Sequence, residues 1–487
     1  MGRAVIWLLL RAGAITDMER LENVISDLRR RGQEHTLRWW PELSPSQRER
    51  LLAELEAIPW PSLAPVIKTH VLGRPELGEL RNVEPARVLP HEPRPDQQAR
   101  YEKAHACGAE IIKHGKVAAF TVAGGQGTRL GFDGPKGCVG VTPVTNKSLF
   151  QLFAEMVLAA RAKYGAAIAW YIMTNAENHE QTRRFFEANH YFGLPQADVM
   201  MFPQGMLPAF DFQGRLLLAD KDHLALAPDG HGGSLKALAA SGALADMRRR
   251  GIEVISYFQV DNPLVKPFDP LFVGLHAETG SEMSTKVARK ADDFEKVGNV
   301  CLVDGRATVI EYTEFPRELA TQRNADGTRC FDAANLAMHL FDAGFVERVA
   351  EKAQLPFRRA EKAVPFINER GELIRPTSPN AIKLETFVFD ALPLAKTPLL
   401  LEVDRAEEFS PVKNATGPDS LETSKRDQVL RACRWLEQAG IAVPRKPDGA
   451  PDVTVEIGPK FAMDGEDVVA RKAGIGPVRG GAVLALG

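Results

Sequence analysis

Short apolar segments with the composition of buried strands recur between helical segments in the middle of this chain. The strands are expected at residues 117–122, 167–173, 199–202 and 254–260. The helices are expected at residues 101–114, 149–157, 177–190 and 234–250. Strands that alternate with helices and are apolar throughout are typical of an open, mostly parallel sheet covered by helices. The sequence therefore predicts an α/β fold, which binds ligands at the carboxyl ends of its strands.

The segments on either side of this pattern differ in character. Residues 18–57 predict helices, with a capping box at Ser44-Pro45-Ser46-Gln47, and residues 58–98 form a proline-rich connection. Two hairpins are expected, one at 210–216 and one at 300–312 that turns at Asp304-Gly305. We therefore expect a helical N-terminal segment (1–98), an α/β domain (99–395) and a small β-rich C-terminal lobe (396–487).

Charge and cysteine usage exclude several classes of protein. The 61 Lys and Arg residues nearly balance 63 Asp and Glu, so the net charge of −2 favours neither a nucleic-acid nor a membrane partner. Five scattered cysteines without a CxxC pair indicate a reducing compartment, and we expect a cytoplasmic protein. The apolar residues 4–10 are too few to cross a membrane, and no cleavage site follows them. A native start at Met18 is an equal alternative to any function for residues 1–17.

The strongest local signal is a glycine-rich loop directly after the first apolar strand. It reads AGGQGTRLG from position 123 to 131, and PKG follows at 135–137. Gly124, Gly125 and Gly127 let the backbone approach a phosphate chain closely, while Arg129 and Lys136 add the positive charge that a polyphosphate requires. The spacing matches neither a Walker loop nor GxGxxG. A phosphate site is the prediction, and a glycine-rich turn with two surface cations is the alternative.

Two more residues carry chemistry that can be derived from their types. Gln204 offers one acceptor and two donors, which suit the imide edge of a base such as uracil. Asp261 follows the strand at 254–260, where a carboxylate could hold Mg²⁺ bridging phosphates. The alternatives are a hydrogen-bonding loop residue for Gln204 and a helix cap for Asp261.

The glycine-rich loop resembles the signature of the nucleotide-sugar pyrophosphorylases. The longer match is to the eukaryotic-type UDP-N-acetylglucosamine pyrophosphorylase and UDP-sugar pyrophosphorylase family. The further matching segments are MFPQGMLPA (201–209), APDGHGG (227–233), VDNPL (260–264), VIEY (309–312), NLA (335–337), NAIKLE (380–385), FSPVKNA (409–415) and VEIGP (455–459). The resemblance implies a Rossmann-like, GT-A-like nucleotidyltransferase core and a UTP:sugar-1-phosphate uridylyltransferase, most directly one acting on N-acetylglucosamine-1-phosphate.

The resemblance also implies roles for individual residues. Gly124, Gly125, Gly127 and Thr128 would cradle UTP, and Gln204 and Gly230 would recognise uridine. Arg129, Lys136 and Lys413 would be the catalytic cations, with Mg²⁺ on Asp261. The sugar would be bound by His231, Gly298, Glu311, Asn335 and Phe387. The substrates would then be UTP and a sugar-1-phosphate, and we expect a monomer or a weak homo-oligomer.

One residue departs from the family pattern. The family usually has Asn where this chain has His231, and GHG is more similar to the UDP-glucose and broad UDP-sugar pyrophosphorylases. The alternatives are therefore the same reaction on glucose-1-phosphate or on several sugars, and a UDP-sugar-binding regulatory protein without catalysis. The combination of Arg129, Lys136, Asp261 and Lys413 argues against the regulatory protein. A nicotinamide oxidoreductase is disfavoured by the glycine spacing.

Overall fold

The computed structural model describes residues 15–74 and 80–487, and the apolar heptad at 4–10 lies outside these residues. The chain divides into two compact units, each assembled from three separate segments. Unit 1 comprises residues 1–78, 205–233 and 355–387, and unit 2 comprises residues 79–204, 234–354 and 388–487. The domain boundaries near residues 98 and 395 stay predictions.

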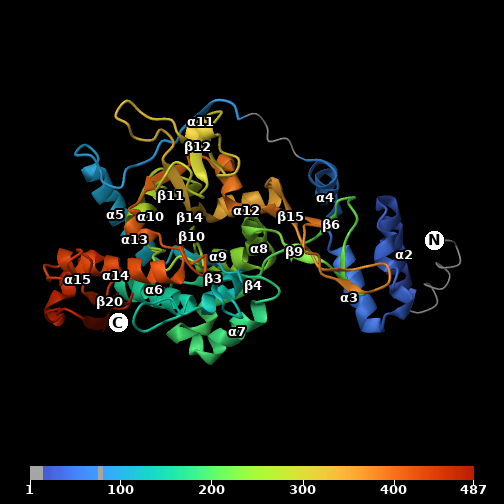
Figure 1. Cartoon of the computed structure of the whole chain (residues 1–487), viewed down its shortest axis with the longest axis horizontal. Helices are drawn as coiled ribbons and strands as arrows, with labels where there is room; N and C mark the ends of the chain where they lie inside the picture. Colours follow the sequence, from blue (N-terminus) through green and yellow to red (C-terminus); the bar gives the residue numbers. More distant parts are fainter. Residues whose placement is uncertain (1–14, 75–79) are drawn as a thin grey trace. The chain divides into compact units, whose positions relative to one another are not determined.

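Unit 2 contains a ten-stranded sheet in the order β1-β12-β14-β10-β2-β3-β4, with β11, β13 and β19 paired beside this path. Its strands are β1 (Val83–Pro85), β2 (Val117–Val122), β3 (Trp170–Thr174), β4 (Val199–Pro203), β10 (Val254–Gln259), β11 (Met283–Arg289), β12 (Asn299–Val303), β13 (Arg306–Ile310), β14 (Ala333–Asp342) and β19 (Leu399–Glu402). Strands β10, β2, β3 and β4 pair in parallel, whereas β14 is antiparallel to both β10 and β11. The open α/β sheet predicted from the apolar segments is confirmed, and its parallel half contains the four strands expected from the sequence. Figure 1 labels β10, β3 and β4 of this half.

Unit 2 has helices at all four predicted positions, although the last of them is interrupted, and it has further helices beyond these. They are α5 (Gln98–Lys113), α6 (Leu149–Tyr164), α7 (His179–Ala188), α8 (Ser234–Ala240), α9 (Ala243–Arg250), α10 (Pro270–Glu278), α11 (Arg317–Ala320), α12 (Ala343–Lys352), α13 (Arg405–Glu408), α14 (Leu421–Gln438) and α15 (Gly465–Arg471). The single helix predicted at 234–250 is wrong, because Gly242 adopts φ 82° between α8 and α9 and interrupts it. The hairpin at 300–312 is confirmed, with Val303 opposite Arg306 and positive φ at Asp304 and Gly305.

Helices α5 and α10 pack at unusually short range through glycine. A Cβ atom added to Gly108 of α5 would lie 1.8 Å from the carbonyl oxygen of Pro270, and one added to Gly274 of α10 would lie 1.7 Å from that of Ala104. Neither position has the φ that favours glycine, so the requirement comes from the approach of the two backbones. No side chain larger than hydrogen fits at this crossing.

The C-terminal part of unit 2 has a small core of its own. Strands β20 (Val453–Ile457) and β21 (Ala482–Leu486) pair in parallel, and α14 and α15 pack around them through a cluster that includes Leu436, Val455 and Val468. Figure 1 shows α14, α15 and β20 gathered at the red end of the chain. The C-terminal segment predicted to be β-rich thus contains β19, β20 and β21, but also the helices α13, α14 and α15.

Unit 1 combines helices from the N-terminus with short strands from two later segments. Its elements are α2 (Ile15–Arg31), α3 (Pro45–Glu56), α4 (Trp60–Val66), β5 (Met206–Pro208), β6 (Phe210–Asp211), β7 (Leu218–Asp220), β8 (His223–Leu224), β9 (Leu226–Pro228), β15 (Phe357–Lys362), β16 (Phe366–Ile367), β17 (Leu373–Ile374) and β18 (Ala381–Thr386). The capping box at Ser44 is confirmed by reciprocal bonds with Gln47. The proline-rich connection predicted at 58–98 contains a short helix, α4, whose Pro61 lies in the first turn, where proline is tolerated. Among residues 15–74 and 80–487, no helix is long and apolar enough to cross a membrane.

Candidate functional site

The glycine-rich loop begins at the carboxyl end of β2, in the parallel half of the sheet. Two asparagines after the neighbouring strand β3 hold its backbone: Asn175 Nδ2 donates to the carbonyl of Gly124 (2.5 Å), and Asn178 Nδ2 donates to that of Ala123 (3.2 Å). Asn178 is fully buried. These contacts use the carbonyl oxygens and fix the loop from the side of β3.

Gly124 lies directly against Gln204. A Cβ atom at position 124 would come within 2.8 Å of Gln204 Oε1, so a larger residue there would displace this amide from the loop. The backbone N–H of Gln204 donates to the carbonyl of Thr174 at the end of β3 (2.8 Å). The structure therefore brings together the predicted uridine-recognising amide and the predicted phosphate loop.

The second half of the loop places two of the predicted charged residues side by side. The backbone N–H of Lys136 donates to the carbonyl of Gly125 (3.0 Å), and its Nζ lies 3.6 Å from Oδ2 of Asp261. Asp261 follows β10, which pairs with β2, so both side chains lie at the carboxyl edge of the sheet. Thr128 and Arg129 lie in a short 3₁₀ turn and are exposed to solvent.

Lys413 is tied to the same edge through its backbone. The N–H of Val412 donates to the carbonyl of Asp261 (2.8 Å), and the N–H of Lys413 donates to that of Asp419 (2.7 Å). Lys413 Nζ lies 5.6 Å from the centre of the Phe409 ring. Burial raises the pKa of Asp419 and the charge of Asp261 raises it further, whereas Lys413 opposes the shift. The two carboxylates Asp261 and Asp419 thus repel each other, while Lys136 lies beside the first and Lys413 acts on the second.

Three of the predicted sugar-binding residues also come together in unit 2. A Cβ atom at Gly298 would lie 3.5 Å from Glu311 Oε1 and 3.8 Å from Asn335 Cβ. The backbone N–H of Asn335 donates to the carbonyl of Gly298 (2.9 Å). The added Cβ would also come within 2.6 Å of Val309 Cγ1, so the lack of a side chain at Gly298 lets Val309 pack closely beside a carboxylate and an amide. Carboxylates and amides are groups that hydrogen-bond sugar hydroxyls.

The remaining predicted residues contact one another in unit 1, where the segment 230–232 lies against the segment 386–387. The rings of His231 and Phe387 are stacked, with centroids 4.9 Å apart and an angle of 2° between their planes. A Cβ atom at Gly230 would lie 2.4 Å from the carbonyl oxygen of Thr386, and one at Gly232 would lie 2.6 Å from the Phe387 nitrogen. Burial lowers the pKa of His231 to about 4, so the ring is neutral at physiological pH.

A magnesium ion could be held at Asp261 only together with a substrate. Within the described residues, no group of three or more His, Cys, Asp or Glu side chains could hold a metal by itself. Mg²⁺ bound to nucleotides commonly takes one or two protein carboxylates, phosphate oxygens and waters. The lone Asp261 carboxylate, beside the predicted phosphate loop, fits that coordination.

Sequence reasoning missed the residues that hold the loops. Asn175 and Asn178 follow the apolar strand β3, as Asp261 follows β10. Their position after a strand could have identified them from the sequence. Asp419 gave no signal, because its relation to Lys413 depends on a turn with φ 56° at Asp419 itself.

Comparisons with known proteins agree with these segments. Residues 81–426 match the UTP–glucose-1-phosphate uridylyltransferase family. The chain is 38% identical to the human UDP-N-acetylhexosamine pyrophosphorylase-like protein 1, over 91% of this chain and 93% of that one. It is 39% identical to the UDP-N-acetylglucosamine pyrophosphorylase of Saccharomyces cerevisiae, over 74% of this chain and 77% of that one.

A solved structure supports the same relationship. The crystal structure of the uridine diphosphate N-acetylglucosamine pyrophosphorylase from Trypanosoma brucei, in complex with an inhibitor, superposes with a TM-score of 0.78. The two sequences are 26% identical, and the match covers 97% of this chain and 99% of the other.

Proposed function

Because the chain belongs to the UTP–glucose-1-phosphate uridylyltransferase family, we propose that it is a uridylyltransferase that makes UDP-N-acetylglucosamine from UTP and N-acetylglucosamine-1-phosphate. The observation that carries the proposal is the grouping of the glycine-rich loop, Gln204, Lys136, Asp261 and Lys413 at one edge of the sheet. The relatives named for N-acetylated sugars favour this substrate over glucose-1-phosphate.

The reaction is an in-line displacement at phosphorus. A phosphate oxygen of the sugar-1-phosphate attacks the α-phosphorus of UTP, the bond from that phosphorus to the oxygen bridging to the β-phosphate breaks, and pyrophosphate leaves. Catalysis is then a matter of positioning and neutralising phosphate charge, with no covalent nucleophile on the protein. Mg²⁺, when bound at Asp261, supplies charge neutralisation to the phosphates.

The residues of the chain have separate tasks in this scheme. The backbone from Gly124 to Thr128 binds the triphosphate, and Arg129 and Lys136 neutralise its charge. Lys413 attracts the phosphate of the sugar substrate, which otherwise repels UTP. Within unit 2, Gln204 contributes to uridine binding, and Gly298, Glu311 and Asn335 contribute to sugar binding. The family resemblance gives Gly230 a role in uridine binding and His231 and Phe387 a role in sugar binding.

The compartment is also part of the proposal. All five cysteines are free, as in proteins of a reducing environment, and this supports a cytoplasmic enzyme.

The direct test is release of pyrophosphate from UTP and Mg²⁺, run in parallel with N-acetylglucosamine-1-phosphate and glucose-1-phosphate. We expect the higher kcat/KM for the N-acetylated sugar. The family description and His231 keep glucose-1-phosphate as the second candidate, and a higher kcat/KM with it would select that substrate. Tight UDP-sugar binding without turnover of either sugar would refute the enzymatic proposal.

Asp261→Asn is expected to uncouple UTP binding from Mg²⁺. Calorimetric titration of the parent protein with UTP should show tighter binding with Mg²⁺ than with EDTA. The variant should lose most of that gain, at least about tenfold in Kd, because an amide is a weaker ligand than a carboxylate. Binding in EDTA should be unchanged or tighter, since Asp261 no longer competes for Lys136. An equal Mg²⁺ effect in both proteins would contradict the assignment.

His231→Asn is expected to shift the sugar preference toward the N-acetylated substrate. Asparagine is shorter than the stacked imidazole and offers both a donor and an acceptor, so it leaves room beside Phe387 for an amide. We expect the ratio of kcat/KM values for the two sugars to change by about tenfold, the size typical of one altered pocket contact. His114→Asn, on the exposed end of α5, is the control and should leave the ratio unchanged. An unaltered ratio in His231→Asn would remove His231 from the specificity pocket.

A further inference from the structure

The segment that carries Lys413 is fastened to the residue next to Asp261. This segment consists of α13 and the following loop, up to Lys413. Asn262 Nδ2 donates to the carbonyl of Glu408 (2.7 Å), and Asn262 Oδ1 accepts the N–H of Ser410 (3.1 Å). The side chain of Asn262 therefore satisfies a donor and an acceptor on either side of Phe409, and it is buried. One amide thus fixes where the loop leaves α13.

A buried ion cluster holds the helical end of the same segment. Lys286 Nζ, on β11, lies 2.6 Å from Glu408 Oε2 and 2.6 Å from Asp269 Oδ2, and its side chain is only 1% exposed. Burial alone would lower the pKa of Lys286, but the charges of Asp269 and Glu408 raise it above its ordinary value. A buried ammonium needs such partners, so Glu408 is held firmly to the sheet.

Side chains of helix α14 also hold the segment. Ser424 Oγ donates to the carbonyl of Ser410 (2.9 Å), and Trp435 Nε1 donates to Glu407 Oε2 (2.8 Å). Arg431 Nη1 donates to the carbonyl of Glu407 (3.2 Å). Side chains therefore donate to the carbonyls of Glu407, Glu408 and Ser410.

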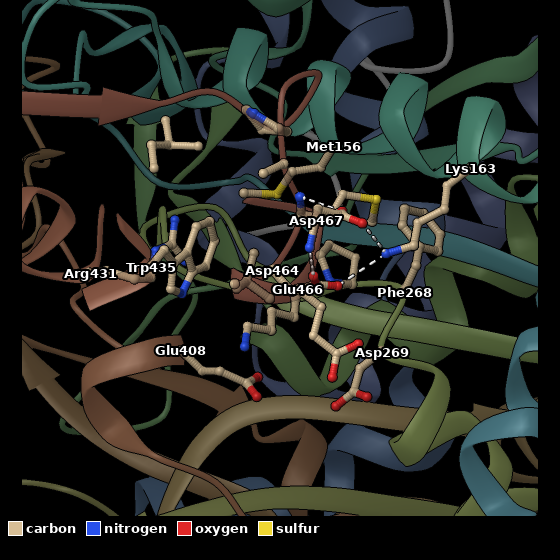
Figure 2. A pocket seen from close by; sticks show the side chains of 18 of the residues that line it. Met156, Lys163, Phe268, Asp269, Glu408, Arg431, Trp435, Asp464, Glu466 and Asp467 are labelled. Atoms are coloured by element: carbon tan, nitrogen blue, oxygen red, sulfur yellow. Dashed lines mark hydrogen bonds and ion pairs between the residues drawn. The ribbon is translucent and has the colours of Figure 1, made fainter. Parts of the chain in front are cut away.

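A cavity of about 790 Å³ lies beside this arrangement. Asp269, Glu408, Arg431 and Trp435 line it, and Figure 2 shows these four side chains around the open space. A surface that faces a cavity lacks the close packing that normally fixes a helix. The polar contacts of Glu408 and Asn262 then help to determine where α13 lies, together with the core packing of Phe409 and Val412.

We propose that Asn262, together with the buried Lys286–Glu408 pair, positions Lys413 to receive the phosphate of the sugar substrate. This inference rests on the proposed function, in which Lys413 attracts that phosphate. Asn262 and Glu408 are positioning residues, because they act on the substrate through the placement of Lys413. The backbone hydrogen bond from Val412 to Asp261 also fixes the position of Lys413 relative to the predicted metal ligand.

The kinetic test compares Asn262→Ala and Glu408→Gln with the parent enzyme. Both variants should raise KM for the sugar-1-phosphate by about tenfold or more, since a displacement of about 1 Å can cost a hundredfold in rate. KM for UTP should stay within about twofold, because Gln204 and the glycine-rich loop are not touched. Glu456→Gln is the matched control: Glu456 is a similarly buried carboxylate that lines the same cavity, but it hydrogen-bonds to Val144 and Thr145 rather than to the Lys413 segment. A general loss, equal for both substrates or shared by the control, would overturn the proposal.

A double-mutant cycle separates positioning from a structural role. In the Lys413→Ala background, adding Asn262→Ala should cost no more than about twofold, because the side chain that Asn262 positions is already absent. Equal losses in both backgrounds would overturn the proposal.

Hydrogen exchange keeps the inference testable apart from activity. The amides of Phe409, Ser410, Val412 and Lys413 should exchange faster in both Asn262→Ala and Glu408→Gln, while exchange in β2 and β10 stays as in the parent protein. If the parent turns over neither sugar, the proposed function fails but this comparison still stands. If exchange in this segment is the same in the variants as in the parent protein, the positioning role is refuted, whether or not the variants are active.

Discussion

Lys136→Ala is expected to lower kcat by about a thousandfold, the loss typical of removing one charged group from a site that stabilises phosphoryl or oxyanion charge. Lys136 is held at the phosphate loop by its backbone bond to Gly125, and its ammonium lies 3.6 Å from Asp261. Without it, the Asp261 carboxylate would face the triphosphate with less compensating charge. Steady-state pyrophosphate release, with both substrates saturating, measures the effect.

A second lysine in the same unit supplies the control. Lys116 precedes β2, at the end of the strand opposite the loop, and pairs with Glu253 (2.7 Å). Lys116→Ala removes an ion-paired lysine without touching the site, and its kcat should stay within about twofold of the parent. Circular dichroism should be unchanged in both variants. If Lys136→Ala retains full turnover with an intact fold, Lys136 is not part of the catalytic charge.

Gly274→Ala is expected to destabilise unit 2 by at least about 3 kcal/mol, above the usual range for an added methyl group. The new Cβ would lie 1.7 Å from the carbonyl oxygen of Ala104, which is backbone and cannot rotate away. The gain of about 1 kcal/mol in helix propensity that alanine brings is smaller than this clash. The melting temperature, followed by calorimetry, should fall by about 5 °C or more.

Gly474→Ala is the matched control for this substitution. Gly474 lies in a 3₁₀ turn, has no atom within 4 Å of the added Cβ, and lacks a positive φ. Its melting temperature should therefore stay within about 2 °C of the parent. A stable Gly274→Ala variant would mean that α5 and α10 can separate without cost.

The sequence allowed the parallel half of the sheet to be predicted because its strands are apolar on both faces. Strands β2, β4 and β10 lie within a residue of their predicted bounds, whereas β3 begins at Trp170, three residues later than expected. The antiparallel strand β14, with alternating burial, was not predicted from its pattern. The assembly of unit 1 from three distant segments could not be predicted either, since local pattern carries no information on long-range pairing.

Some residues of the candidate site could likewise be predicted from the sequence, and others could not. Residues at the carboxyl ends of strands, such as Asp261, were found because position and residue type agree. Lys413 was found only through the family resemblance, since a lysine in a loop has no distinctive pattern. Asn262 and Lys286 were missed because their importance lies in partners far along the chain: Glu408 is 146 residues from Asn262 and 122 from Lys286.

The three-segment construction of unit 1 constrains how the chain can acquire its structure during synthesis. One apolar cluster joins Leu28 and Leu51 of the N-terminal helices to Phe210 and to Ile382, and β18 pairs with β6 across about 170 positions. The N-terminal helices therefore lack part of their apolar partner surface until residue 384 has left the ribosome. Loop closure over such distances is slow. The N-terminal segment of unit 1 can complete its core only after the segment 355–387 has been synthesised. A chain interrupted before residue 384 would leave leucines of α2 and α3 exposed, and such surfaces are bound by chaperones and cleaved by proteases.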